Sequence, residues 1–288
     1  AEYTFVVTEE VDLVARFVTN GNIAFADPNV KSICVAHWDS DGDGELSYLE
    51  AAQVTNLGNW FQGNETIVSF NELQYFIGLT AIPANAFKNC SGLVSVVLPN
   101  SIVTIGNYAF HNCSGFTGSL TIGNSVTEIG NYSFSYCIRC TSFEMNKGLK
   151  YIGNYAFMCD YSLESVVIPA TVEKMGQGAF DSCRGLRDFP GLKSVTILGN
   201  TAPSYTDIST EGWFRHCTEL ESVSASCDIP YGAFYNCTSL RTVKLNDGCK
   251  KIMMYAFYDC SSLASVEFAG SIEEIQDGAF YNCSNLSL

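Results

Sequence analysis

Apolar and polar residues alternate over short stretches of this chain, and the alternation returns at a nearly constant interval. Residues 93–99 and 163–169 are two examples, each of which ends at a proline. Alternation of this kind, closed by a proline, is typical of a short β-strand that stops at a turn. The pattern therefore predicts many short, evenly spaced strands.

A phenylalanine marks the repeating unit, at intervals of 20 to 34 residues and most often 23. Cysteine follows the phenylalanine by three positions in every unit but one, where Asp160 stands, and leucine commonly follows by six. A unit of this size cannot bury an apolar face alone, so neighbouring units must stack into a solenoid with a ladder of equivalent side chains in its core. The nine phenylalanines are Phe87, Phe110, Phe134, Phe157, Phe180, Phe214, Phe234, Phe257 and Phe280.

The segment around each phenylalanine carries Ala, Phe and Cys at three-residue spacing. That spacing predicts a single helical or 3₁₀ turn on the side opposite the strand. The longest interval, between Phe180 and Phe214, contains an insertion, and we expect it to protrude as a loop near residues 198–213.

The unit reads I-G-x-x-A-F-x-x-C-x-x-L-x-x-V-x-L-P and resembles the BspA-like leucine-rich repeat of bacterial surface proteins over residues 79–288. The resemblance implies a right-handed leucine-rich-repeat solenoid of about nine units, β-rich within the α/β class. It also implies an extracellular place at the bacterial cell surface, and adhesion to or recognition of a host protein or polymer without a catalytic site. It names no ligand.

Eight of the 13 cysteines occupy the repeating position, where a buried thiol behaves as a small apolar side chain. Their even spacing places each thiol beside its equivalent rather than in a tetrahedral cluster, so we expect free, buried thiols. Cys227 and Cys249 lie about one unit apart, which leaves a disulfide between them open. The pair Cys137 and Cys140 leaves a zinc or redox role open.

Residues 39–50, DSDGDGELSYLE, fit the twelve-residue EF-hand calcium loop, with Gly44 at its sharp turn. The alternative is an acidic glycine turn that binds no ion. A single loop without a second one favours a structural Ca²⁺ site, with a Kd of about 10⁻⁴ to 10⁻³ M. The expected ligands are Asp39, Asp41, Asp43, the main-chain carbonyl of Glu45, Ser47 through a water molecule, and the bidentate carboxylate of Glu50.

Helices are predicted on both sides of this loop. Asp27 and Pro28 begin the first, which runs to Trp38, and the capping box formed by Ser47 and Glu50 begins the second, which runs through Val54. We expect residues 21–78 to form a helical, EF-hand-like cap over the open N-terminal edge of the repeats.

Residues 1–20 follow a different pattern, in which apolar residues alternate on both sides of a Thr-Glu-Glu turn. This pattern predicts a β-hairpin. The segment resembles the closing hairpin of internalin-type B-repeat modules, which implies the remnant of an upstream module.

The charge of the chain excludes some partners. Its net charge of −15 repels phosphate backbones and anionic lipids, so we expect no nucleic-acid partner. No Asp, Glu, Lys or Arg occurs between Lys88 and Glu128, yet polar residues interrupt this stretch before it reaches the roughly 18 apolar residues of a membrane span. We therefore expect a soluble monomer without a transmembrane segment.

The sequence carries no recognisable catalytic motif, such as GxSxG, HExxH or a phosphate-binding glycine loop. The three histidines, His37, His111 and His216, are isolated, and each is interpreted as a packed or solvated turn residue. We therefore predict that the protein is not an enzyme.

Two groups of tyrosines occupy equivalent positions in successive units, so stacking of the units aligns each group into a row. Aligned tyrosines can stack on sugar rings or anchor a protein partner. Alternatively, they pack edgewise on one another as part of the solenoid wall. Tyr108, Tyr132, Tyr155 and Tyr255 lie two positions before the phenylalanine, and Tyr235, Tyr258 and Tyr281 lie one position after it.

These observations predict a secreted or surface-anchored bacterial protein that binds a host protein, a matrix protein or a polysaccharide through its repeats. One alternative is a carbohydrate-binding accessory protein of a polysaccharide-utilisation system, which the tyrosine rows would serve. Another is a structural spacer that displays other domains.

Overall fold

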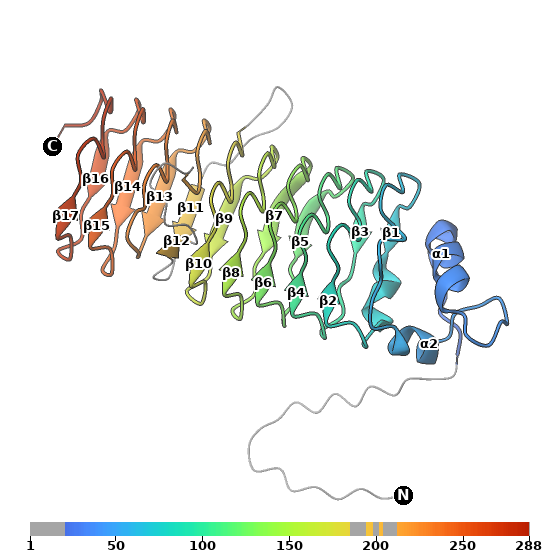
Figure 1. Ribbon diagram of the computed structural model, residues 1–288. Helices are drawn as coiled ribbons and strands as arrows, with labels where there is room; N and C mark the ends of the chain where they lie inside the picture. The colour runs from blue at the N-terminus through green and yellow to red at the C-terminus, as the bar shows by residue number, and fades with distance from the viewer. Residues whose placement is uncertain (1–20, 185–193, 198–201, 204–211, 288) are drawn as a thin grey trace, which may run out of the picture.

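The computed structural model describes residues 21–184, 194–197, 202–203 and 212–287. Over these ranges the chain winds into an elongated stack of coils, with two short helices at its N-terminal end (Figure 1). The predicted leucine-rich-repeat solenoid is confirmed: it has about eight turns of parallel strands and little helix. The hairpin predicted at residues 1–20 lies outside the described residues.

Two helices precede the coils, α1 (Pro28–Trp38) and α2 (Tyr48–Gln53), and a short 3₁₀ helix, η1 (Asn71–Tyr75), follows them. The carboxylate of Asp27 caps α1 by accepting a hydrogen bond from the N–H of Asn29 at 2.8 Å. Both hydrogen bonds of the predicted capping box of α2 are present. The predicted helix starts are thus confirmed, while α2 ends one residue earlier than expected.

The coils contribute strands to two sides of the stack, and all strand pairs in the described residues are parallel. On the short-strand side the coil of Ile229 has only an isolated bridge to Ile252. The short-strand side consists of β2 (Ala81–Ile82), β4 (Thr104–Ile105), β6 (Glu128–Ile129), β8 (Tyr151–Ile152), β10 (Lys174–Met175), β12 (Ala202–Pro203), β15 (Lys251–Ile252) and β17 (Glu274–Ile275). The long-strand side consists of β1 (Ser69–Phe70), β3 (Ser95–Val96), β5 (Gly118–Thr121), β7 (Cys140–Glu144), β9 (Ser165–Ile168), β11 (Ser194–Ile197), β13 (Ser222–Ala225), β14 (Thr242–Leu245) and β16 (Ser265–Glu267).

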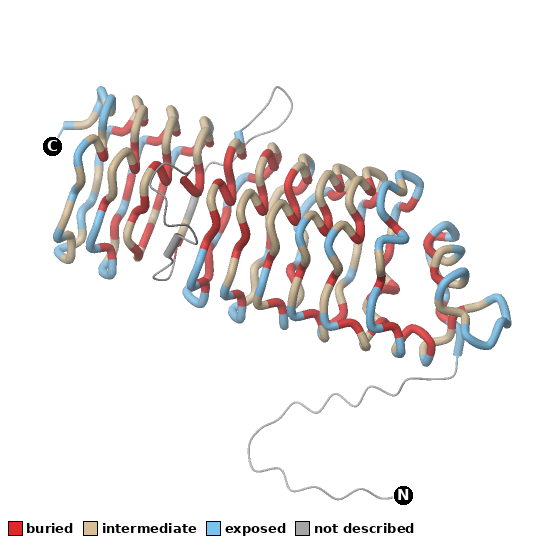
Figure 2. Tube along the Cα trace, viewed as in Figure 1, coloured by how far each residue is buried: buried red, intermediate tan, exposed pale blue. Residues whose placement is uncertain are grey.

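The nine phenylalanines form one continuous column inside the stack. Successive rings lie 4.9–5.5 Å apart between centroids, and their planes differ by no more than 9°. Beside this column, the N–H of each phenylalanine except Phe280 donates to a carbonyl of the next coil, as Phe87 does to Ala109 at 2.8 Å. Buried positions consequently recur at the same place in successive coils, up to the last coil, where Phe280, Cys283 and Leu286 are only half-buried (Figure 2).

The repeating cysteines form a second column, and their thiols are hydrogen-bonded. Each thiol donates to the main-chain carbonyl of the phenylalanine one coil earlier, for example Cys113 to Phe87 at 3.0 Å and Cys183 to Phe157 at 3.0 Å. A cysteine at this position therefore fills a small apolar space and also satisfies a buried carbonyl. None of the 13 cysteines forms a disulfide, so none joins Cys227 to Cys249, and all of them except Cys283 are buried, as expected.

The segments around the phenylalanines differ from the expected helical turn. Each is a hydrogen-bonded turn, and in all but the turn at Phe214 a left-handed residue lies two positions before the phenylalanine and another two positions after it, such as Tyr108 (φ 57°) and Asn112 (φ 56°). Left-handed residues stop a helix from continuing. Asparagine and glycine tolerate this conformation best, and they often occupy the two positions.

The insertion between Phe180 and Phe214 also differs in part from the expected protruding loop. Its residues Ala202 and Pro203 form β12, which pairs in register with Lys174 and Met175 of β10 and extends the short-strand side by one strand. Most other coils carry an isoleucine in this short strand, five positions before the phenylalanine, but the coil of Phe214 has Ser209 there. Part of the insertion therefore supplies the short strand of this coil. Its remaining residues at 198–201 and 204–211 lie outside the described residues.

The first coil begins earlier than the repeating pattern suggests. The ring of Phe61 stacks on Phe87 with centroids 5.2 Å apart, and Ser69 of β1 pairs in register with Ser95 of β3. The sequence pattern missed this coil because Asn64 stands where the other coils carry cysteine.

Asp27 joins the helical segment to the edge of this first coil. Its second carboxylate oxygen accepts hydrogen bonds from the N–H groups of Val68, at 2.5 Å, and Ser69, at 3.3 Å. These N–H groups lie at the N-terminal edge of the long-strand side, where no preceding strand is available within the described residues. One carboxylate therefore caps α1 and also satisfies the sheet edge.

Candidate functional sites

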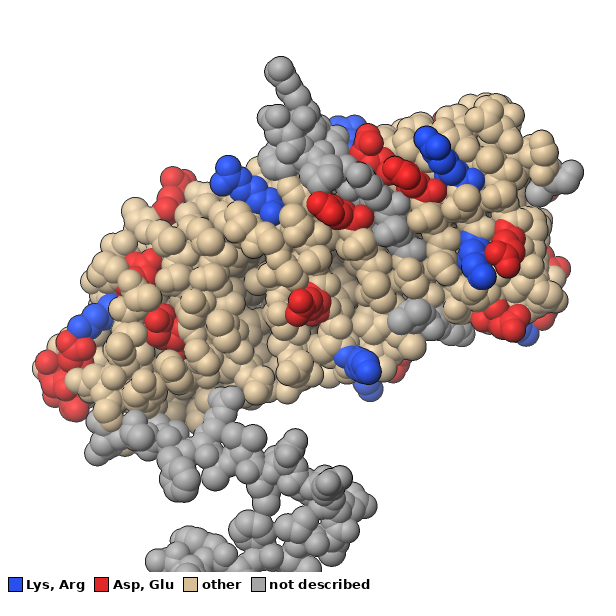
Figure 3. Space-filling view, turned by 180° about the vertical axis from the view of Figure 1, so that it is seen from behind, with Lys and Arg blue, Asp and Glu red and all other residues tan. Residues whose placement is uncertain are grey.

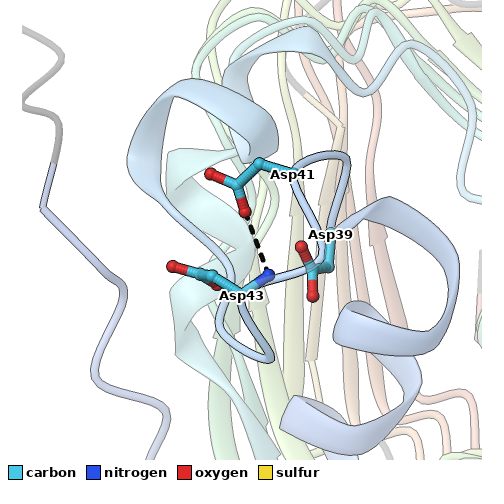
Figure 4. Close-up of side chains that lie close together, drawn as sticks. All are labelled: Asp39, Asp41 and Asp43. Carbon is cyan, nitrogen blue, oxygen red and sulfur yellow. Dashed lines mark hydrogen bonds between the residues drawn. The ribbon is translucent and has the colours of Figure 1, made fainter.

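The acidic loop between α1 and α2 gathers three of the predicted metal ligands. Carboxylate oxygens of Asp39, Asp41 and Asp43 lie within 4.8 Å of one another (Figure 4). The loop holds them through its own N–H groups: Gly42 donates to Asp39 at 2.7 Å, and Asp43 donates to Asp41 at 3.2 Å. An all-oxygen set with several carboxylates is the shell that a hard divalent cation such as Ca²⁺ prefers.

Glu50 is not part of this group of three carboxylates. One of its oxygens accepts from the N–H and hydroxyl of Ser40 at 2.7 and 2.9 Å, and the other from the N–H and hydroxyl of Ser47 at 2.8 and 2.9 Å. Both oxygens are therefore engaged in holding the two ends of the loop together. The side chain of Glu45 pairs with Lys31 at 2.5 Å, which leaves its main-chain carbonyl as the predicted ligand.

Two carboxylates of the loop, those of Glu50 and Asp41, have displaced pKa values. Burial alone would raise the pKa of Glu50, but the hydrogen bonds from Ser47 and Ser40 outweigh it and lower the pKa to about 2. For Asp41 the hydrogen bond from Asp43 lowers the pKa, yet desolvation and the neighbouring carboxylates outweigh it, so its pKa is raised. Mutual repulsion of this kind is relieved when a cation binds.

The tyrosines of the first row stack flat on one another, not edgewise. Tyr108 and Tyr132 have centroids 4.9 Å apart and planes 4° apart, and Tyr132 and Tyr155 have centroids 4.9 Å apart. The ammonium group of Lys88 lies 4.9 Å from the centroid of Tyr108, over its outer face. Tyr255 belongs to a separate part of the stack and meets Tyr258 edge to face.

The second row is built in the same way. Tyr235 and Tyr258 lie 4.7 Å apart with planes 2° apart, and Tyr258 and Tyr281 lie 5.1 Å apart. The guanidinium group of Arg215 covers Tyr235 at 4.8 Å, while 59% of Tyr281 is exposed. Stacking on a sugar requires a ring face, and neighbouring rings or cations occupy most of the faces in both rows. The rows therefore offer a ligand mainly ring edges and hydroxyl groups.

The histidines do not form a catalytic arrangement with the groups around them. His111 lies 2.7 Å from the hydroxyl of Ser135, but Ser135 is fully buried and donates to the carbonyl of Tyr132. A substrate cannot reach this hydroxyl. His216 contacts the amide of Asn236 at 3.0 Å, and His37 stacks on Trp60 with centroids 3.9 Å apart.

Charged side chains are sparse on the surface, and several of them are paired between coils. Lysine and glutamate 23 residues apart face each other, as in Lys250 with Glu273 at 3.0 Å and Lys251 with Glu274 at 3.1 Å. Figure 3 shows isolated charged groups on a face that is otherwise uncharged.

Three hollows follow one another along the long-strand side. The first, of about 550 Å³, spans β3 and β5; the second, of about 370 Å³, spans β7 and β9; and the third, of about 630 Å³, spans β11, β13, β14 and β16. Volumes of this size suit small ligands or segments of a longer polymer. The sequence does not reveal these hollows, because alternation identifies a strand but not the shape of its outer surface.

A family assignment follows from the repeats. The BspA type leucine rich repeat region, in six copies, matches residues 80–209 and 206–288. The chain belongs to this family. Membership indicates a binding role. No curated protein matches the chain.

Solved structures of other leucine-rich-repeat proteins resemble it. A leucine rich cell surface protein of Faecalibacterium prausnitzii A2-165 is 25% identical with a TM-score of 0.43, and the match covers 76% of this chain and 58% of that protein. The chain thus spans little more than half the length of that protein. A leucine-rich repeat protein of Bacteroides ovatus ATCC 8483 is 20% identical, with 84% and 82% covered and a TM-score of 0.41. The leucine rich repeat protein of T. pallidum is 24% identical, with 72% and 82% covered and a TM-score of 0.48.

Within the described ranges, no helix combines the length and the apolar character needed to cross a bilayer.

Proposed function

We propose that this protein is an extracellular recognition protein of the bacterial cell surface. Its long-strand side binds an extended partner, either a host or matrix protein or a polysaccharide. The observation that carries this proposal is the line of three hollows along one side of the stack. A partner that lies along the axis of the solenoid contacts many coils at once, so modest contacts from each coil add to a useful affinity.

The surface location rests on the family and on the similarity to a protein described as a leucine rich cell surface protein. The tyrosine rows are proposed as a second contact area, in which ring edges and hydroxyl groups meet the partner. Tyr281, with the most exposed ring of its row, is its most accessible member.

We further propose that the acidic loop binds one structural Ca²⁺. Asp39, Asp41, Asp43, the carbonyl of Glu45 and the carboxylate of Glu50 would hold it, with Ser47 acting through a water molecule. The convergence of three carboxylates and the raised pKa of Asp41 support this assignment. Because Glu50 must exchange hydrogen bonds for the ion, a weak site is expected, consistent with the range of about 10⁻⁴ to 10⁻³ M for extracellular modules.

The test is binding of the intact chain to immobilised host glycoproteins, matrix proteins and polysaccharides, with Ca²⁺ and then with EDTA. We expect saturable binding to at least one of these surfaces, and its loss when a charge is placed on the long-strand side by Val167→Asp. Val167 is 52% exposed, so the substitution should not unfold the chain. Absence of binding to every surface, with the fold intact, would favour the structural spacer over a recognition protein.

A further inference from the structure

The first hollow lies within the charge-free part of the chain. Its lining residues fall between Val94 and Asn124, and no Asp, Glu, Lys or Arg occurs from residue 89 to residue 127. The chain as a whole carries a net charge of −15. The hollow between β3 and β5 is therefore an uncharged site on an acidic protein, and no ion pair with a ligand can form from its lining.

The long-strand side is interrupted at this hollow. β1 pairs with β3 and β5 pairs with β7, but no strand ladder joins β3 to β5 within the described residues. On the other side of β5, its pairing with β7 shifts register between Gly118 and Ser119, and Gly118 adopts a φ of 72°. Irregular pairing of this kind is common beside binding sites.

The interruption does not leave room for another strand. On the opposite side, β2 and β4 remain paired, and in the core the rings of Phe87 and Phe110 stay 5.1 Å apart. An inserted peptide strand would need the coils to separate to about twice the usual spacing of about 4.8 Å. The hollow is thus an open depression that receives a ligand from solvent.

The lining combines polar groups with exposed apolar surface. The side chains of Ser95, Thr117, Asn100 and Asn124 make no hydrogen bond with another group in the described part of the chain. Their hydroxyl and amide groups can therefore exchange water for the hydroxyl groups of a ligand. Val97, of which 42% is exposed, adds apolar surface to the hollow.

Two further hydroxyl groups are oriented by a carboxylate at the border of the hollow. Ser119 and Thr121 donate to the two carboxylate oxygens of Glu144 at 3.3 and 2.9 Å. Because each hydroxyl donates its hydrogen to Glu144, its oxygen can only accept a hydrogen bond from a ligand. The site thus holds fixed acceptors beside groups that can donate.

We propose that the hollow between β3 and β5 binds a neutral carbohydrate, as a segment of an uncharged linear glycan. Sugars present hydroxyl groups around a ring with apolar C–H faces, which matches hydroxyl and amide groups placed beside exposed valine. Anionic glycans are disfavoured because the site contains no cation and the protein is acidic. This inference rests on the proposed function of the long-strand side and names the class of polymer that it recognises.

The experiment is calorimetric titration of the full chain with cellohexaose, xylohexaose and mannohexaose, and with hexagalacturonate as the charged probe. We expect saturable binding of at least one neutral sugar and none of hexagalacturonate. Val97→Asp should weaken that binding at least about tenfold, because the carboxylate takes the place of apolar contact surface and must be desolvated by the sugar.

Val103→Asp is the matched control. Val103 is also 42% exposed, but it precedes β4 on the short-strand side and does not line the hollow. Its variant should bind the sugar as the original chain does. Thermal melting of both variants checks the fold, and Thr117→Glu replaces Val97→Asp if the latter unfolds.

Other outcomes overturn the inference in distinguishable ways. If no neutral sugar binds, but a matrix protein binds and Val97→Asp abolishes that binding, the carbohydrate assignment fails while the proposed recognition function stands. If a sugar binds and both aspartate variants leave the affinity unchanged, this hollow is not the site. If neither sugars nor immobilised proteins bind, both proposals fail.

Discussion

The solenoid and its N-terminal cap use different means to stay folded. In the solenoid the repeating buried side chains have their own equivalents as neighbours, as Phe157 has between Phe134 and Phe180. In the cap the contacts are unique and rely on ionised carboxylates, chiefly Asp27 and Glu50, each of which accepts several main-chain hydrogen bonds. The apolar column does not depend on pH, whereas the cap does.

One coil of the solenoid contains a buried carboxyl group in place of an apolar side chain. Asp160 replaces the repeating cysteine, is fully buried, and accepts a hydrogen bond from the N–H of Cys137 at 2.8 Å, while its other oxygen has no partner. Burial raises its pKa well above the usual range of an aspartate, despite that hydrogen bond. The cap therefore favours ionised carboxylates and the column favours a neutral one, so the two regions should respond oppositely to pH.

The largest effect is expected from Phe157→Ala, which removes one ring from the middle of the column. The cavity between two remaining rings should lower the free energy of unfolding by about 3–5 kcal/mol. Urea unfolding followed by circular dichroism measures the loss. Phe268→Ala is the control, because Phe268 is 37% exposed and stands outside the column. Equal losses for the two variants would contradict the assignment of stability to the column.

Asp160→Cys restores the repeating residue and should stabilise the protein at pH 7 by about 2 kcal/mol. The pKa of Asp160 is raised in the folded state. The contribution of this carboxyl group to the free energy of unfolding is therefore fully present below the ordinary pKa of an aspartate and is lost as the pH rises. The gain from the substitution should therefore be small near pH 4 and larger at pH 7. Urea midpoints at the two pH values test this, and a gain independent of pH would refute a neutral carboxyl.

Removal of Ca²⁺ should destabilise the cap by about 1.4 kcal/mol if 10 mM Ca²⁺ meets a site with a Kd of about 1 mM. Glu50→Gln should abolish the difference in melting temperature between Ca²⁺ and EDTA while the repeats stay folded. Glu128→Gln, on β6 and far from the loop in sequence, should keep that difference. If EDTA leaves the melting temperature of metal-loaded protein unchanged, the ion has no structural role.

Glu50 also gives the cap its dependence on acid. Its folded pKa of about 2 lies below the ordinary value, so its contribution is present above about pH 4.5 and is lost as the pH falls towards 2. In EDTA, thermal melting of the original chain should therefore fall over this interval, and Glu50→Gln should lack that part of the fall. Identical acid profiles for the two proteins would show that the hydrogen bonds from Ser40 and Ser47 contribute little.

An effect smaller than that of Phe157→Ala is expected in the cysteine column. Cys183→Ala removes the thiol that donates to the carbonyl of Phe157 and should cost about 1–2 kcal/mol, because a buried carbonyl loses its partner. Cys183→Ser retains a donor and should recover part of that loss. Comparison of the two urea midpoints separates the contribution of the hydrogen bond from that of packing. If the serine variant is less stable than the alanine variant, the cysteine stabilises the column through packing alone.

Much of the solenoid could be predicted because the same residue pattern recurs in successive units. Phenylalanine, cysteine, leucine and isoleucine at constant offsets must stack on their equivalents, since no single unit buries them. The helix starts at Asp27 and Ser47 were predictable for another reason: caps depend on residues adjacent in the chain. The coil of Phe61 escaped detection because its cysteine position holds Asn64, and the strand at residues 202–203 escaped because no isoleucine marks it.

The sequence by itself determined the period of this protein, the side chains that face its core and the acidic loop before the repeats, because each depends on spacing along the chain. Only the tertiary structure decided how the tyrosine rings meet, where Glu50 directs its oxygens, and that β3 and β5 separate into an uncharged hollow. These features depend on the distance and rotation between neighbouring coils. Contacts between residues more than 20 positions apart determine this distance and rotation, so a pattern of adjacent residues cannot predict them.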